Sequence, residues 1–208
     1  MIRPPGFRGA VFGDASDGDA RRDPEARARL AAALGISEHW AWLRQVHGAE
    51  VVAVTDPGDQ GDGDAAYTTV PGLPLAVSTA DCFPVVLEGD RVVGVAHAGW
   101  RGVVAGVVSA LRRAMEGAGV TPARAAIGPG IGPCCFEVGP EVGGRFPATG
   151  AWTEWGTPSV DLAATIAGEL EGLEIWMSPD CTMGNTRYHS HRRDGTPRRQ
   201  VTVAWLPG

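Results

Sequence analysis

The sequence predicts an α+β fold, in which strands that follow one another in the chain pair directly and a few helices accompany them. Of the 208 residues, 44% are hydrophobic and 20% are charged, the balance of a globular chain. Short apolar segments of strand length outnumber helical stretches, and several follow one another with no helix between them. No internal repeat or linker divides the chain, so we expect a single domain over residues 1–208.

Three helices are expected from their end signals and spacing. Asp23 is a typical N-cap and Pro24 suits the first helical position, so the first helix begins there and ends before Gly35. Apolar residues at helical spacing predict a second helix over residues 100–115. Residues 161–170 form the third, which opens with an aspartate at the N-cap.

The strands are predicted from short runs of β-branched and apolar residues between turn signals. A turn at Gly48 separates the first two, and the turn at Gly89-Asp90 makes a hairpin of two others. The glycine- and aspartate-rich stretch 56–64 predicts a flexible acidic loop. The expected strands are residues 40–46, 51–54, 75–78, 85–87, 92–96, 123–127, 175–178 and 201–205.

The composition excludes several classes of function. A net charge of -6 does not suit a protein that binds nucleic acid through bulk positive charge. All 18 basic residues are arginine, so no lysine is available for a Schiff base or a P-loop. No apolar run reaches the roughly 18 residues that a membrane helix needs, and the first residues lack a signal-peptide core. We therefore expect a cytoplasmic protein with no membrane, nucleic-acid or evident protein partner.

The cysteines and histidines limit the metal chemistry. A cytoplasmic chain keeps its four cysteines reduced. Cys134 and Cys135 are adjacent and no CxxC occurs, which excludes a thioredoxin motif and a zinc ribbon. Five histidines are too few for a multicopper oxidase, whereas one mononuclear metal site stays possible.

Polar residues gather where three apolar segments end. His47, Cys82 and His97 would give zinc two imidazoles and one thiolate, with a fourth position open for water or substrate. Asp81 adjoins the thiolate and is the carboxylate expected to orient a ligand or transfer a proton. The same spacing also fits a surface histidine, a buried cysteine and a core imidazole, and that alternative stays open.

Five stretches in order carry a family resemblance: RQVHGAEVV, PGLPLAVSTADCFPVVL, VGVAHAGWRGVVAGVV, AIGPGIGPCCFEVG and SHRRDG. On these motifs the chain, from about Phe7 to Leu206, resembles the YfiH/YlmD-type family. That family is also called the DUF152, laccase-domain or polyphenol oxidase family, and it includes purine nucleoside phosphorylases. The resemblance implies a compact α/β/β/α arrangement, similar to the catalytic domain of cytotoxic necrotizing factors.

The same resemblance implies a metal and an activity. One zinc ion per chain is expected on His47, Cys82 and His97, and copper is not expected. The implied reaction is phosphorolysis of adenosine, inosine and methylthioadenosine to the free base and a ribose 1-phosphate, with adenosine deamination at the same site. His189 and His191 stand where relatives often carry Phe and Tyr, which leaves the substrate preference open.

Phosphorolysis requires an anion site, and in a chain without lysine arginine must supply it, because its planar fork donates two parallel hydrogen bonds. The candidates near the motifs are Arg44, Arg101, Arg192 and Arg193. Strand alternation places Gln45 on the same face as His47, so the expected catalytic residues are Cys82, Asp81 and Gln45.

Two further features are candidates for binding an anion or a purine. The glycines of residues 128–132 would let backbone N–H groups approach an anion, or they form a plain loop. Trp152 and Trp155 are candidates for stacking on a purine, whereas Trp100 is expected in the core.

Other functions remain as alternatives. The same zinc site would suit an amidohydrolase that edits a peptidoglycan precursor, which requires no phosphate. A copper polyphenol oxidase is less favoured, because none of the four methionines stands beside the motifs as an axial ligand. A thiol hydrolase with Cys82 as nucleophile would require that no metal occupies the sulfur. A non-enzymatic binding module fits poorly with polar residues gathered at strand ends.

Overall fold

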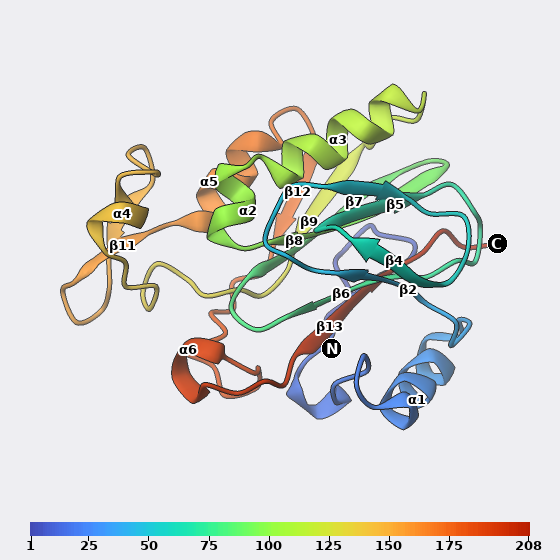
Figure 1. Ribbon diagram of the computed structural model, residues 1–208, viewed down its shortest axis with the longest axis horizontal. Coiled ribbons are helices and arrows are strands. Elements are labelled where there is room, and N and C mark those ends of the chain that lie inside the picture. Colours follow the sequence, from blue (N-terminus) through green and yellow to red (C-terminus); the bar gives the residue numbers. More distant parts are fainter.

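The computed structural model describes residues 1–208 and contains two β-sheets stacked face to face, with helices on both outer sides (Figure 1). The layered α/β/β/α order is therefore visible in the ribbon, and the α+β prediction is confirmed as a mixed fold with several sheets. The expected likeness to the catalytic domain of cytotoxic necrotizing factors stays a prediction.

The six-stranded sheet lies beneath the larger helices. Its central strands pair antiparallel, while the two outermost pairs are parallel. In spatial order the strands are β12 (Glu174–Met177), β9 (Arg124–Ile127), β7 (Phe83–Gly89), β8 (Val92–Ala98), β5 (Ala65–Thr68) and β3 (Val51–Ala53).

The five-stranded sheet forms the second layer. The β1–β13–β6 part is antiparallel, and the β2 pairs with β6 and β4 are parallel. In spatial order the strands are β1 (Ala10–Phe12), β13 (Gln200–Ala204), β6 (Leu75–Thr79), β2 (Ala41–Arg44) and β4 (Gly58–Asp62).

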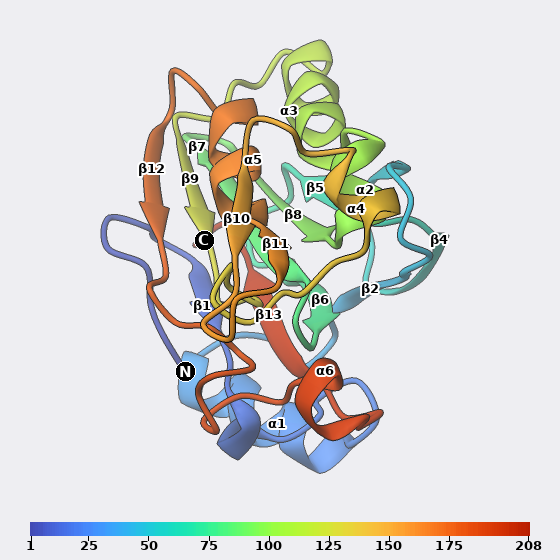
Figure 2. The ribbon, with the colours of Figure 1, turned by 90° about the vertical axis from the view of Figure 1, so that its left-hand side faces the viewer.

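The remaining elements cover these sheets or extend from them. Figure 2 brings to the front the small hairpin β10 (Gly150–Trp152) and β11 (Pro158–Val160), with α4 beside it. A short 3-10 turn covers Ala15–Asp17. The helices are α1 (Pro24–Leu34), α2 (Trp100–Val104), α3 (Val107–Gly117), α4 (Pro140–Gly143), α5 (Leu162–Glu169) and α6 (His191–Asp194).

Strand alternation distributes the apolar side chains over three cores. On β7, Val85 and Leu87 pack against the helices α3 and α5, whereas Val86 faces the other sheet. Because both faces of β7 and β8 are covered, every residue of these strands is buried. The third core lies under α1, where Leu30 packs near Val203 of β13.

Several local predictions are confirmed. The Asp23 side chain accepts hydrogen bonds from two N–H groups of the first turn of α1, and Gly35 ends that helix in the left-handed conformation. The hairpin around Gly89 forms as expected and is longer, since β7 and β8 each have seven residues. Asp161 caps α5 through the N–H of Ala164.

Two predictions of local structure are wrong. Residues 100–115 form two helices, because Gly106 has a φ of 76° and interrupts the helical path between α2 and α3. Part of the stretch 56–64 is the strand β4, which carries mostly exposed polar residues and is held by its backbone pairing with β2. The two strands predicted around Gly48 are present as β2 and β3, which lie in different sheets.

Strands β1, β5, β10 and β11 were not predicted, because each has only three or four residues. Runs of that length carry almost no periodic signal.

The glycines of residues 128–132 pack against aromatic rings. A Cβ at Gly128 would lie 2.3 Å from the Phe12 ring, and a Cβ at Gly130 would lie 2.4 Å from the Phe83 ring. Close packing therefore accounts for these two glycines, and the expected approach to an anion is not needed to explain them.

We expect Gly130→Ala to destabilise the protein by about 1–3 kcal/mol, because the added methyl forces the buried Phe83 out of its place. Gly117→Ala is the matched control, since no atom lies within 4 Å of a Cβ there. Chemical denaturation followed by circular dichroism measures both. Equal stability of the two variants would show that Phe83 yields without cost.

Candidate metal and anion site

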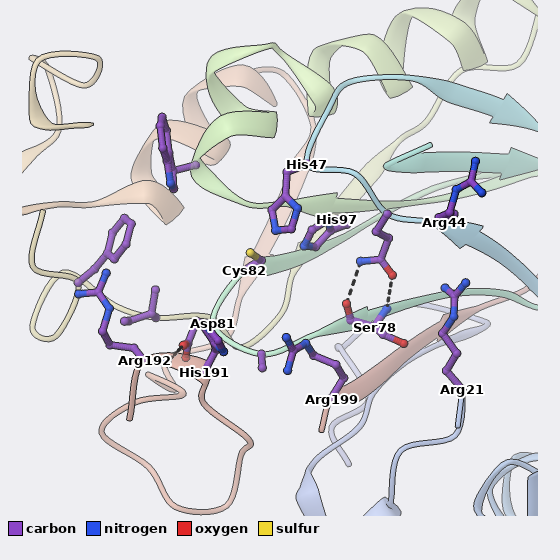
Figure 3. Close-up of a pocket in the computed structure, with 15 residues that line it drawn as sticks. Arg21, Arg44, His47, Ser78, Asp81, Cys82, His97, His191, Arg192 and Arg199 are labelled. Atoms are coloured by element: carbon purple, nitrogen blue, oxygen red, sulfur yellow. Dashed lines mark hydrogen bonds between the residues drawn. The ribbon is translucent and has the colours of Figure 1, made fainter. Parts of the chain in front are cut away.

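A cavity of about 560 Å³ opens where the ends of both sheets meet. In Figure 3, His47, Cys82 and His97 lie together, with Arg21 and Arg44 to their right, Arg199 below them and Arg192 to their left. The cavity therefore combines a cluster of metal-binding side chains with an unusual concentration of guanidinium groups.

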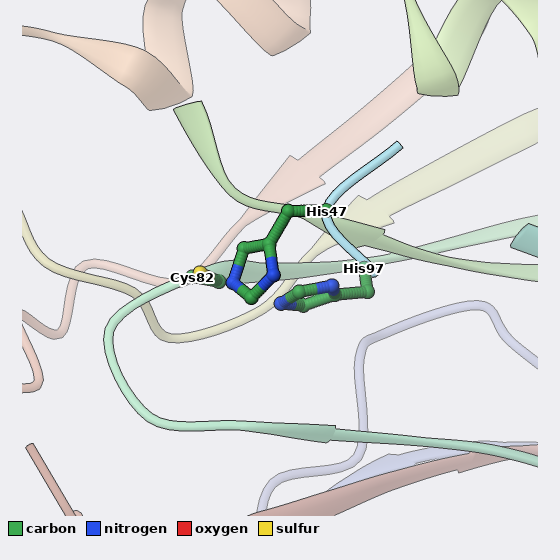
Figure 4. Close-up of side chains that lie close together, drawn as sticks. All are labelled: His47, Cys82 and His97. Atoms are coloured by element: carbon green, nitrogen blue, oxygen red, sulfur yellow. The ribbon is translucent and has the colours of Figure 1, made fainter. Parts of the chain in front are cut away.

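The three predicted metal ligands lie together, although they are distant in sequence (Figure 4). His47 follows β2, Cys82 directly precedes β7, and His97 lies within β8. The donor atoms of the three side chains are within 4.8 Å of one another, and the two imidazole rings are 4.8 Å apart between centroids. The β7–β8 hairpin brings the last two together, because it pairs Pro84 with His97.

Asp64 organises this cluster. Its Oδ1 lies 2.7 Å from Nδ1 of His97 and accepts the backbone N–H of His47 at 3.0 Å. Its Oδ2 accepts the N–H groups of Val46 at 3.1 Å and Gly48 at 2.7 Å. The Asp64 side chain has no exposed surface. With Nδ1 engaged by the carboxylate, His97 presents Nε2 to the cluster, which is how histidine ligands of metals are commonly fixed.

Asp64 was not predicted, and it takes the place that the sequence analysis gave to Asp81. The carboxylate of Asp81 accepts the Thr182 hydroxyl and the backbone N–H of Arg192, each at 2.7 Å. Asp81 thus makes no hydrogen bond to His47 or His97. The available signal was an aspartate at the end of an acidic stretch, immediately before the apolar residues of β5.

The protein's own charges favour the thiolate form of Cys82. Burial raises the pKa of the Cys82 thiol, but His97 and His47 together lower this pKa to about 6. Burial lowers the pKa of His97, while Cys82 and Asp64 raise it to about 9. Burial also raises the pKa of Asp64, and its hydrogen bonds with His97 and the N–H groups bring it below the usual value. In the order Cys82, His97 and Asp64, the side chains of the cluster are therefore negative, positive and negative.

The backbone at the cluster is strained in two places. His47 has a φ of 62° and Asp81 a φ of 82°, the only non-glycine residues with positive φ in the chain. Each such residue costs about 1–3 kcal/mol and persists only where neighbouring contacts enforce it. The bonds to Asp64 enforce the first, and the bonds of Asp81 to Thr182 and Arg192 enforce the second.

Gly99 allows the cluster to close. A Cβ at this position would lie 2.8 Å from Sγ of Cys82 and 3.1 Å from Cδ2 of His47. A side chain larger than hydrogen would therefore displace two of the three donor groups.

Gln45 holds the two strands β2 and β6 together beside the cavity. Its amide Nε2 donates to the Ser78 carbonyl at 2.8 Å, and its Oε1 accepts the Ser78 N–H at 2.9 Å. Gln45 therefore lines the same cavity as the predicted metal ligands. Its polar atoms are engaged with the backbone. The buried hydroxyl of Ser78 has no partner.

Two of the four predicted arginines line the cavity. Arg44 forms an exposed ion pair with Asp62, and Arg192 donates from Nη1 to the Glu137 carbonyl at 2.9 Å. Arg101 and Arg193 do not line it, and their role in binding phosphate stays a prediction. The Arg101 guanidinium stacks on Trp100 at 4.3 Å, and Arg193 binds backbone carbonyls together with Asp194.

Arg21, Arg199 and His191 line the cavity as well. Arg21 lies before α1 and Arg199 directly before β13, so residues from near both ends of the chain complete the same wall. No carboxylate pairs with the guanidinium of Arg21, Arg192 or Arg199. Each of these guanidinium groups uses only its Nη1, which in Arg199 donates to two backbone carbonyls. His189, in contrast, lies outside the cavity lining.

The aromatic walls differ from those predicted. Trp100 and Phe136 line the cavity, although Trp100 was expected in the core. Trp152 and Trp155, the expected stacking residues, are 69% and 49% exposed in and beside β10 and do not line the cavity.

We expect Asp64→Asn to weaken zinc binding about 10–100-fold, because the amide cannot both accept the three N–H groups and hold Nδ1 of His97. The metal-free variant should also lose about 1–3 kcal/mol of stability. Competition with a chromogenic chelator measures the affinity. Asp62→Asn, an exposed change two residues away, is the control. Unchanged zinc affinity in Asp64→Asn would contradict the positioning role.

No helix of the structure is both long and apolar enough to cross a membrane.

Known proteins resemble this chain over nearly its whole length. It is 40% identical to the purine nucleoside phosphorylase ORF3 of Streptomyces griseus, over 97% of this chain and 90% of that protein. It is also 40% identical to a purine nucleoside phosphorylase of Deinococcus radiodurans, over 97% of this chain and 83% of that protein.

Solved structures share the fold. YlmD from Geobacillus stearothermophilus superposes with a TM-score of 0.87 at 29% identity, covering 100% of this chain and 98% of YlmD. The Bacillus licheniformis hypothetical protein YfiH gives 0.80 at 28% identity, covering 88% and 80%. The family model described as multi-copper polyphenol oxidoreductase laccase matches residues 5–207. The resemblance to the family of YfiH and YlmD, which was drawn from the five motifs, is therefore confirmed. The chain belongs to this laccase-domain family.

Proposed function

We propose that this chain is a zinc-dependent purine nucleoside phosphorylase. It would cleave adenosine, inosine and methylthioadenosine to the free base and a ribose 1-phosphate. Adenosine deamination would be a side activity of the same site. One observation carries the proposal: the His47, Cys82 and His97 cluster faces a cavity in which three of the four lining arginines, Arg21, Arg192 and Arg199, have no carboxylate partner. The names of the relatives from Streptomyces and Deinococcus support the reaction class.

The donor set suits one zinc ion. Two imidazoles and a thiolate are common zinc ligands, and the open cavity leaves room for water or substrate at a fourth position. Asp64 already holds His97 in the orientation that ligation needs. When bound, zinc supplies Lewis-acid charge to a substrate oxygen or nitrogen. The other three histidines lie outside the cluster, so it lacks the imidazoles that an oxygen-reducing copper cluster would need.

Arg199 is the phosphate ligand of this proposal. Arg21, Arg192 and Arg199 each use only Nη1 of the guanidinium in hydrogen bonds, but Arg21 also stacks on Trp42 and Arg192 on Phe136. Nε and Nη2 of Arg199 are therefore free to donate in parallel to an oxyanion. Arg21 lines the same cavity, and so does Ser78, whose buried hydroxyl has no partner. These groups would hold phosphate with its charge neutralised.

The opposite wall suits the purine. Trp100, Phe136 and Ile131 offer apolar surface, and the Arg192 guanidinium stacks on the Phe136 ring at 5.5 Å. A nucleoside lying across the cavity would place its ribose between this wall and the arginines.

In the proposed reaction a phosphate oxygen forms a bond to C1′ of the ribose while the C1′–N9 bond breaks. The electron pair of that bond leaves with the purine, which takes up a proton. Positive charge develops on the ribose, so the nucleophile must be held close without being protonated, and arginines that stay charged at every physiological pH do this. Asp81 is an acceptor in both of its hydrogen bonds, which assigns it to positioning Cys82 and Arg192.

The decisive test combines metal analysis with phosphate dependence. We expect zinc in the purified protein and release of free base from adenosine and inosine only when phosphate is present, followed by chromatography. Cys82→Ala should lose the zinc of this cluster and both the phosphorolysis and the deamination. Full phosphorolysis in the metal-depleted variant would contradict the assignment. Zinc without any nucleoside turnover would favour the phosphate-independent amidohydrolase that edits a peptidoglycan precursor.

We expect Arg199→Gln to raise the KM for phosphate at least roughly tenfold, because a hydrogen bond between charged groups contributes about 1.5–3 kcal/mol. Arg198→Gln is the control, since this exposed neighbour has no side-chain hydrogen bond and does not line the cavity. Initial rates at varied phosphate measure both. A KM for phosphate that is the same in the two variants would assign the anion to another arginine.

A further inference from the structure

A second cluster of sulfur atoms lies apart from the zinc-binding set. Sγ of Cys134 is 3.3 Å from Sγ of Cys135, and together with Cys181 the three sulfurs lie within 4.8 Å of one another. All three are free thiols. Cys135 is buried, while Cys134 and Cys181 are half-buried, so an ion from solvent can reach the sulfurs.

The cluster forms where two distant segments of the chain meet. Gly130 and Cys181 form a parallel bridge, and the Thr182 N–H donates to the Gly130 carbonyl at 2.9 Å. The N–H of Gly132 points at Sγ of Cys181 at 3.2 Å, across a separation of 49 residues. The adjacent pair at 134 and 135 follows directly, so the backbone already holds the three sulfurs together.

We propose that Cys134, Cys135 and Cys181 form a second metal site, which binds a thiophilic d10 cation. Soft thiolate ligands select Zn2+ and Cu+. Zn2+ would take the three sulfurs and a water molecule at about 2.0–2.3 Å, and Cu+ would need only the three sulfurs. Both ions require the same ligand chemistry, and the experiment below separates them.

Electrostatics supports a cation at this position. Burial and the neighbouring sulfurs raise the pKa of Cys134 above its usual range, and burial raises the pKa of Cys135 as well. Burial also raises the pKa of Cys181, but the N–H groups of Gly184 and Gly132 and the neighbouring thiols bring it below its usual value. A bound cation would compensate the negative charge of three sulfurs that lie within 4.8 Å of one another. N–H groups directed at sulfur are a common outer support of metal-bound thiolates.

The ion would fasten one wall of the cavity. Ile131 and Phe136 belong to the segment of Cys134, and Thr182, next to Cys181, donates to Asp81. Metal at the three sulfurs would join these two segments, which no disulfide links. This role is structural and does not depend on which substrate the cavity binds.

The metal content of matched variants tests the proposal. Protein purified without added metal is analysed by native mass spectrometry and elemental analysis, which identify the ion as zinc or copper. We expect two ions per chain in the wild type, one in Cys181→Ser, one in Cys82→Ser and none in the double variant. A wild type whose metal is lost entirely in Cys82→Ser and is unchanged in Cys181→Ser would overturn the proposal.

A second measurement needs no variant and so does not depend on folding. Alkylation by iodoacetamide, mapped by peptide mass spectrometry, should spare Cys134, Cys135 and Cys181 in protein loaded with Zn2+ or, anaerobically, with Cu+. A chelator should expose all three together and lower the Tm. Cobalt loading of Cys82→Ser should give a strong thiolate charge-transfer band. Equal alkylation with and without metal, or a disulfide from Cys181 to either neighbour in place of the ion, would refute the site.

Discussion

The carboxylate of Asp64 is the contact on which the candidate site depends. The chain crosses between the two sheets here: β4 belongs to the five-stranded sheet, β5 to the six-stranded sheet, and Asp64 stands between them. From this buried position it binds the turn that follows β2 and the imidazole in β8. One side chain therefore fixes two ligand-bearing segments from different sheets. It also offsets the cost of the left-handed backbone at His47, because three consecutive N–H groups are satisfied only in that conformation.

Charge is distributed unevenly over the cavity, because the two sheets meet here and contribute different side chains. The negative groups Asp64 and Cys82 lie on the cluster side, with His97 between them. The guanidinium groups lie on the other side, on residues that come from β2, from the segment before α1 and from the start of β13 (Figure 3). A cation and an anion can thus bind different groups of one cavity. In the proposed reaction, the arginines would offset the negative charge of phosphate, and a bound cation would draw electron density toward the departing base.

Features set by neighbouring residues were predictable from sequence, and features set by register between sheets were not. Asp23 and Gly35 bound a helix through their own backbone preferences, and the β7–β8 hairpin needs only its turn and its apolar strands. The motifs carried the prediction of His47, Cys82 and His97, which lie together in the structure. In contrast, β4 has no apolar pattern, because its pairing with β2 uses only backbone groups. Arg21 and Arg199 reach one cavity only because β13 lies between β1 and β6, and no local pattern encodes that order.

Asp81 connects the segment of Cys82 with the segment of Cys181. It precedes Cys82 in the chain, and its carboxylate accepts the hydroxyl of Thr182, which follows Cys181. The Asp81 carboxylate thus holds the segments of Thr182 and Arg192 against the segment of Cys82. Both carboxylate oxygens accept hydrogen bonds, so removing either donor leaves a buried negative charge with fewer partners. Asp81 is therefore the contact that links the two segments. This role explains why a strained backbone is tolerated beside Cys82, where a glycine would relieve the strain but lose the contact.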